Sequence, residues 1–144
     1  TLEGGDILRV GRTLFVGRST RTNEDGIRQL EKIVRPFGYR VTPVKVNGCL
    51  HLKTGVTCPA DGLLIINPAW IDRAAFREFA IEAVPTAEPW GANTFDVNGK
   101  VLVAESAPQT AELLRARGLN AFRVDVSEFE KAEAGLTCLS VLYA

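Results

Sequence analysis

Two reactive side chains stand out in this sequence: His51, which is the only histidine, and Cys138, a thiol near the C-terminus. A cysteine and a histidine that meet in space are the minimum for catalysis by a thiolate nucleophile, because the imidazole exchanges the protons that the reaction requires. Glu3 is a third candidate, since a carboxylate can orient a histidine and stabilise its protonated form. Taken singly, these residues also fit a hydrogen-bonded strand histidine, a buried thiol and an acidic turn residue.

A repeated order of elements would bring these residues together. Short β-type runs over residues 6–10 and 13–17 predict a hairpin, followed by a helix between 22 and 37 and a strand over 39–46. The same order returns as strands 51–58 and 63–67, helix 72–79 and strand 81–84, and again as strands 94–97 and 101–104, helix 108–117 and strand 120–124. We therefore expect an α/β fold in which strand-strand-helix-strand repeats, at about 3–48, 49–90 and 91–144, form a single domain over residues 1–144.

The candidate residues follow the same repeat. Glu3, His51 and Asn93 each precede the first strand of a unit, and Cys138 comes next at a similar period of about 45 positions. If the units surround an axis, their equivalent ends converge, so the repeat predicts that all four residues lie together. Three units do not close a ring comfortably and the sequence contains no methionine, so we expect further units upstream in a longer chain.

The composition argues against several other functions. Seventeen basic and seventeen acidic residues cancel, so neither nucleic acid nor an anionic membrane is an expected partner. No apolar run approaches the ~20 residues of a membrane span and no signal peptide is recognisable, so a cytoplasmic location is the default expectation. The spacing of Cys49, His51 and Cys58 matches no common zinc pattern, and phosphate-binding glycine loops are absent, so we expect neither a metal nor a cofactor.

Six short motifs, in order and at matching spacing, resemble a known group of enzymes. They cover residues 2–6, 15–17, 19–23, 50–53, 91–93 and 136–140. Together they are similar to the guanidino-modifying (pentein) superfamily and, within it, to the dimethylarginine dimethylaminohydrolases. The resemblance implies a pentein-type α/β propeller of five blades, of which this chain would supply the last three.

The resemblance also implies a reaction and roles for named residues. Cys138 would attack the guanidinium carbon of a methylated arginine, His51 would transfer protons and Glu3 would orient His51, giving citrulline and an alkylamine. Arg21 resembles the residue that holds the α-carboxylate of the substrate, and the backbone near Ala132 would contact the amino-acid end of the substrate.

Other roles stay open at this stage. Asn93 fits a hydrogen-bonding residue of the site or a turn residue before a strand, and Asp6 fits a site residue or a strand-entry residue. Lys53 favours dimethylarginine hydrolysis, because arginine deiminases, which release ammonia, usually carry an aspartate two residues after the histidine. A deiminase-like hydrolase acting on another guanidine, and a non-catalytic propeller segment, are the two alternatives. The expected partners are a small guanidino substrate and the N-terminal segment of the same propeller, and exposed blade surfaces would also favour a homo-oligomer.

Overall fold

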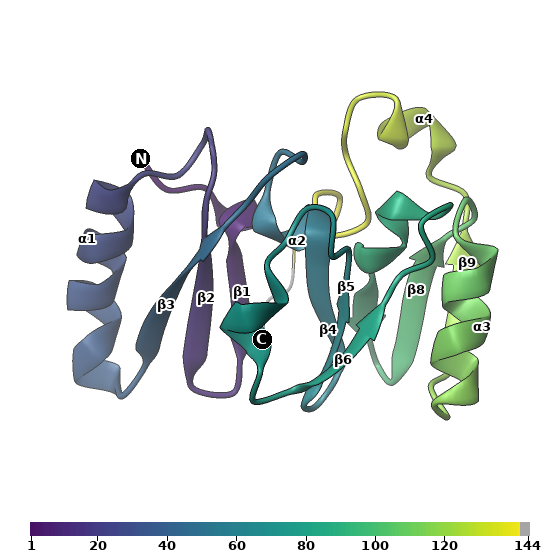
Figure 1. Ribbon diagram of the computed structural model, residues 1–144, viewed down its shortest axis with the longest axis horizontal. Helices are drawn as coiled ribbons and strands as arrows, with labels where there is room; N and C mark the ends of the chain where they lie inside the picture. Colours follow the sequence, from purple (N-terminus) through teal and green to yellow (C-terminus); the bar gives the residue numbers. More distant parts are fainter. Residues whose placement is uncertain (142–144) are drawn as a thin grey trace.

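Three small sheets form the framework of the protein in the computed structural model, which describes residues 1–141. In each sheet two antiparallel strands form a hairpin and a third strand joins in parallel to the second strand. Figure 1 shows the sheets side by side in one row, with α1 at one end and α3 at the other. The repeat of strand, strand, helix and strand is confirmed for the first and third units. Residues 142–144, the end of the third predicted repeat, lie outside the described residues.

The first unit agrees closely with the prediction. Its elements are a 3-10 turn at Gly4–Asp6, β1 (Ile7–Val10), β2 (Thr13–Arg18), α1 (Glu24–Val34), a 3-10 turn at Arg35–Phe37 and β3 (Arg40–Lys45). The side chain of Asn23 accepts a hydrogen bond from the backbone N–H of Gly26 and so caps α1. Ile27 anchors α1 on the sheet beside Leu14 and Val16.

The second unit departs from the prediction in two places. It contains α2 (Leu52–Gly55), β4 (Val56–Ala60), β5 (Leu63–Ile66), a 3-10 turn at Arg73–Phe76 and β6 (Ala80–Ala83). The strand predicted from residue 51 begins only at Val56, because the buried carboxylate of Asp6 accepts the N–H of Leu52 and helps to hold a helical turn there. The helix predicted over 72–79 is a 3-10 turn, which ends where Phe76 and Phe79 pack on Phe15.

The third unit contains one helix that the sequence analysis missed. Its elements are a 3-10 turn at Pro89–Ala92, β7 (Phe95–Val97), β8 (Lys100–Ala104), α3 (Pro108–Ala116), β9 (Ala121–Val124) and the unpredicted α4 (Ser127–Glu130). The hairpin between β7 and β8 turns at Asn98 and Gly99, whose φ angles of 51° and 71° are those of a type I′ turn. A tight turn of this kind sets the register of the two strands.

Two apolar cores lie between neighbouring sheets and hold the row together. Phe15 and Val44 of the first sheet pack with Leu64, Ile66 and other residues of the second unit. On the other side, Ile65 and Val84 of the second unit pack with third-unit residues that include Val103 and Leu114. Because alternate residues of the middle sheet point into different cores, the three units have a fixed spacing. None of the described helices is long and apolar enough to cross a membrane.

Candidate active site

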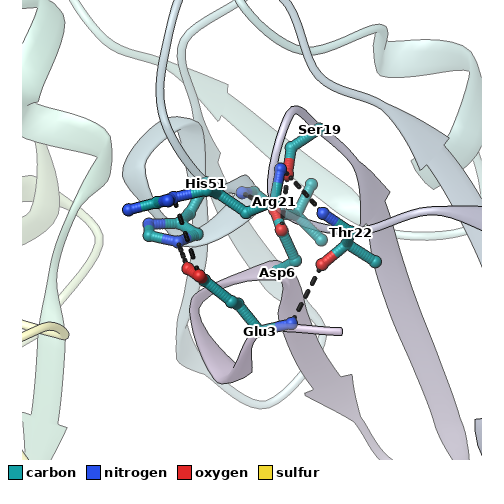
Figure 2. A network of polar contacts seen from close by, with 7 residues as sticks. Glu3, Asp6, Ser19, Arg21, Thr22 and His51 are labelled. Atoms are coloured by element: carbon teal, nitrogen blue, oxygen red, sulfur yellow. Dashed lines mark hydrogen bonds and ion pairs between the residues drawn. The ribbon is translucent and has the colours of Figure 1, made fainter. Parts of the chain in front are cut away.

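Glu3 and His51 form a direct pair at the start of the first two units. Oε2 of Glu3 lies 2.5 Å from Nε2 of His51, and Figure 2 shows the carboxylate directed at the imidazole ring. This hydrogen bond is the main cause that lowers the pKa of Glu3 below its ordinary value of 4.5, and the charge of Arg21 adds to the effect. Glu3 therefore engages Nε2 of the ring.

The His51 ring is largely enclosed. Its side chain is only 13% exposed, and Nδ1 is buried without a hydrogen-bond partner among residues 1–141. Gly5 packs directly against the ring, since a Cβ atom at this position would lie 2.6 Å from Cγ of His51. The loop that carries Glu3 therefore requires a residue without a side chain beside the imidazole.

Asp6 fixes the backbone on which this pair depends. It is fully buried, its Oδ1 accepts the N–H of Leu52 at 2.9 Å and its Oδ2 accepts the hydroxyl of Ser19 at 2.6 Å. Ser19 in turn accepts the backbone N–H groups of Arg21 and Thr22. One carboxylate thus joins the residue that follows His51 to the loop that carries Arg21, as Figure 2 shows. These contacts show that Asp6 holds the backbone around the pair, and Asp6 is not among the residues that line the pocket beside it.

Cys138 lines the same pocket as Glu3 and His51. The pocket has a volume of about 380 Å³, and its walls also include Gly4, Gly5, Lys53, Thr137 and Ser140. Cys138 is exposed, and its backbone N–H donates to the carbonyl of Gly135 in a tight turn. The predicted meeting of the thiol, the imidazole and the carboxylate around one space is confirmed.

Lys53 contributes an ammonium group to the wall of this pocket, in addition to the imidazole of His51. Burial lowers the pKa of its ammonium group, and the negative charge of a Cys138 thiolate acts in the opposite direction. A half-buried ammonium therefore lies on the wall of the pocket that also contains the thiol.

Asn93 is also connected to this group, through hydrogen-bond partners that the sequence did not identify. Its side chain is buried and makes hydrogen bonds to Lys53 and Thr137, which neighbour the two reactive residues in sequence. The period of the repeat correctly predicts that Asn93 converges with the other candidates.

Arg21 lies beside the pair, whereas no hydrogen bond or ion pair described within residues 1–141 joins Ala132 to it. Nε of Arg21 lies 3.6 Å from Oε1 of Glu3, so one carboxylate faces both the imidazole and a half-exposed guanidinium. Ala132 lies in the exposed turn after α4, where its N–H donates to the carbonyl of Phe129. The next residue, Glu133, has a left-handed backbone with φ of 56°.

The thiols of the other two cysteines are half-buried and donate hydrogen bonds to backbone carbonyls. The thiol of Cys49 donates to the carbonyl of His51, and burial raises its pKa to about 12. Burial also raises the pKa of Cys58, whose thiol donates to the carbonyl of Ala60. Within residues 1–141, no three histidine, cysteine, aspartate or glutamate side chains are grouped closely enough to hold a metal ion.

Known proteins resemble this chain in sequence and in fold. The chain is 44% identical over 143 residues to an N(G),N(G)-dimethylarginine dimethylaminohydrolase of Streptomyces coelicolor, and the match covers 98% of this chain and 54% of that protein. A solved dimethylarginine dimethylaminohydrolase of Pseudomonas aeruginosa, a cysteine-to-serine variant complexed with citrulline, matches with a TM-score of 0.88 and 32% identity over 94% of this chain and 53% of that chain. The inosamine-phosphate amidinotransferase of Streptomyces griseus shares the fold, with a TM-score of 0.83 at 20% identity over 95% of this chain and 44% of that chain.

The fold is that of the pentein proteins, whose solved members include hydrolases and amidinotransferases. No family model matches the chain. Within the pentein class, the sequence comparison is more specific: the chain is homologous to dimethylarginine dimethylaminohydrolases, at 44% and 33% identity, over nearly its whole length. It spans about half the length of the curated relatives that it matches.

Proposed function

We propose that this chain carries the catalytic half of a hydrolase that converts a methylated arginine to citrulline and an alkylamine. The observation that carries the proposal is the Glu3–His51 pair, 2.5 Å apart, on the wall of a pocket that also contains Cys138. The similarity of the chain to dimethylarginine dimethylaminohydrolases supports the choice of substrate class.

The first half of the proposed reaction forms a covalent intermediate. The Cys138 thiolate attacks the central guanidinium carbon and forms a C–S bond, giving a tetrahedral adduct. His51 donates a proton to the methylated nitrogen, the C–N bond breaks and the alkylamine leaves. A thiouronium remains on Cys138, and Glu3 stabilises His51 in its charged state before the proton is transferred. In the proposed complex, the positive charges of the substrate and of Lys53 attract the negative charge of the attacking sulfur.

The second half returns the enzyme to its starting state. His51, now neutral, accepts a proton from a water molecule as the oxygen attacks the thiouronium carbon. The C–S bond then breaks, Cys138 leaves as the thiolate, and the remaining hydroxyl proton passes to the solvent as citrulline is released. One water is consumed for each alkylamine and citrulline formed, and no redox step or cofactor is needed.

Two further contacts are proposed for substrate binding. The planar guanidinium of Arg21 suits a bidentate contact with the α-carboxylate of the substrate, and its position beside Glu3 supports that role. The backbone near Ala132 would contact the amino-acid end of the substrate. The left-handed Glu133 next to it supports this proposal, because uncommon backbone conformations are concentrated at ligand sites.

We also propose that the three units, as one domain over residues 1–144, complete a five-bladed propeller with two further blades upstream. Coverage of 54% of a relative is close to three fifths. The outer face of the third sheet supports the proposal, since Phe122 on β9 is 42% exposed while Phe95 and Leu102 are half-buried. Self-association of these surfaces and a cytoplasmic location stay predictions.

The test uses the full-length protein with Cys138→Ser and His51→Ala. Both substitutions should abolish citrulline formation from a methylated arginine, while circular dichroism and thermal melting show that folding is retained. Full activity in either folded variant would refute the proposal. Release of ammonia from arginine at a higher kcat/KM than release of alkylamine would favour the deiminase-like alternative, and no turnover of any guanidine would favour a non-catalytic segment.

A further inference from the structure

The loop that carries Cys138 has few anchors of its own. Within residues 1–141, no helix or strand follows α4, so the thiol lies on irregular backbone. Leu136 is buried in a small apolar cluster with Ala104 and Val126 and fixes one side of the loop. The neighbouring Thr137 is held instead by polar contacts, and all of those described are made to Asn93.

Asn93 uses its amide group to join this loop to the segment that carries His51. Its Nδ2 donates to the carbonyl of Lys53 at 2.7 Å and to Oγ1 of Thr137 at 2.9 Å, while its Oδ1 accepts the N–H of Thr137 at 3.1 Å. Both amide protons are thereby used. The carbonyl of Lys53 requires a donor and the N–H of Thr137 requires an acceptor, so these two partners determine which amide atom of Asn93 is Nδ2 and which is Oδ1.

Both segments reach close to the reactive residues. Lys53 lies in α2 directly after His51 and Leu52, and the bond from Leu52 to Asp6 holds that backbone in place. Thr137 precedes Cys138, whose N–H is bonded to Gly135. Gly135 packs directly against the side chain of Asn93, since a Cβ atom at Gly135 would lie 2.5 Å from Oδ1 of Asn93.

We propose that Asn93 is a positioning residue that sets the separation of Cys138 and His51, and that it does so without touching the substrate. The inference rests on the proposed function and adds to it a device for alignment. A thiolate on irregular backbone needs such a tie, because a misplacement of about 1 Å costs on the order of 10²-fold in rate.

The test compares Asn93→Ala with Thr57→Val in the full-length enzyme. Thr57 is a matched control: it is buried, its hydroxyl donates to the carbonyl of Ala92 and accepts the N–H of Thr94, and Lys53 and Thr137 are not among its hydrogen-bond partners. Valine keeps the shape of threonine, so Thr57→Val removes hydrogen bonds to Ala92 and Thr94, which flank Asn93 in sequence. The hydrogen bonds of Asn93 to Lys53 and Thr137 are left in place.

The kinetic result should separate positioning from other roles. Asn93→Ala should lower kcat about 10²-fold and change KM by less than about threefold, because the lost interaction acts on alignment and not on binding. Thr57→Val should keep kcat within about threefold of the parent at a comparable fall in Tm. A raised KM with normal kcat would indicate direct substrate contact and overturn the proposal, as would an equal loss of kcat in both variants or no loss in Asn93→Ala.

Hydrogen exchange tests the tie independently of any reaction. In Asn93→Ala, the backbone N–H of Thr137 loses its acceptor, so exchange in residues 134–141 should accelerate by about fivefold or more, the factor expected for one lost hydrogen bond. Thr57→Val should leave exchange in this segment unchanged. If the parent enzyme forms no citrulline but the exchange result holds, the proposed function fails and the tie stands. Unchanged exchange in Asn93→Ala would overturn the tie itself.

Discussion

Replacing Gly5 by alanine should misplace the catalytic imidazole. The new Cβ atom would lie 2.6 Å from Cγ and 2.8 Å from Cδ2 of His51, where ordinary contacts begin at 3.4 Å. The ring must therefore retreat by about 0.8 Å or the loop carrying Glu3 must move by the same amount, and either shift stretches the 2.5 Å contact between Glu3 and His51. A displacement of about 1 Å costs on the order of 10²-fold in rate, or about 2.7 kcal/mol of transition-state stabilisation.

Gly4→Ala is the matched control for this prediction. Gly4 lies in the same 3-10 turn and lines the same pocket, but a Cβ atom there would meet nothing within 4 Å. The assay is steady-state citrulline formation in the full-length protein, with thermal melting to confirm folding. We expect kcat of Gly5→Ala to fall about 10²-fold and kcat of Gly4→Ala to fall much less. Equal losses would show that any methyl group in this turn obstructs the pocket, and normal activity of Gly5→Ala would refute the argument that the ring has no room to move.

Two further substitutions test the partners of His51. Glu3→Gln should lower kcat about 10²-fold with little change in KM, because the neutral amide stabilises the imidazolium less well. In the parent protein, the Glu3–His51 pair should persist above pH 4.5 and be lost only as the pH falls through the lowered pKa of Glu3. A pH titration of the His51 resonances by NMR would measure this loss. Arg21→Ala should raise KM about tenfold to a hundredfold at nearly constant kcat, the loss expected for a charged hydrogen bond to a carboxylate, and substrate saturation curves with a normal KM would indicate a solvated loop arginine.

Much of the framework was predictable because it depends on local sequence signals. Asn98-Gly99 specifies a tight hairpin, since both positions must adopt positive φ. Asn23 and the apolar spacing that follows it specify α1. Once these signals recur with the same order and period, the convergence of Glu3, His51 and Cys138 follows from the repeat without any knowledge of contacts.

The departures occur where a distant side chain decides the local structure. Residues 51–55 have no strong helical pattern, and their turn is held by Asp6, which lies 46 positions before Leu52. The turn at Arg73–Phe76 likewise ends where aromatic packing on Phe15 takes over. A pattern within one segment contains no information about such partners, so the sequence assigned a strand and a longer helix.

The same reasoning explains why the roles of Asp6 and Asn93 could not be predicted from their residue types. Aspartate at a strand entry and asparagine before a strand are common in ordinary turns, and that interpretation competes evenly with a site role. What distinguishes them is burial combined with full use of their polar atoms: Asp6 accepts two hydrogen bonds from separate segments, and Asn93 makes three. Buried polar groups of this kind are costly unless satisfied, so each makes the relative position of the segments it joins hard to change. Both residues hold the backbone that follows His51: Asp6 joins it to the loop that carries Arg21, and Asn93 joins it to the loop that carries Cys138. Loss of either residue should therefore displace the imidazole of His51.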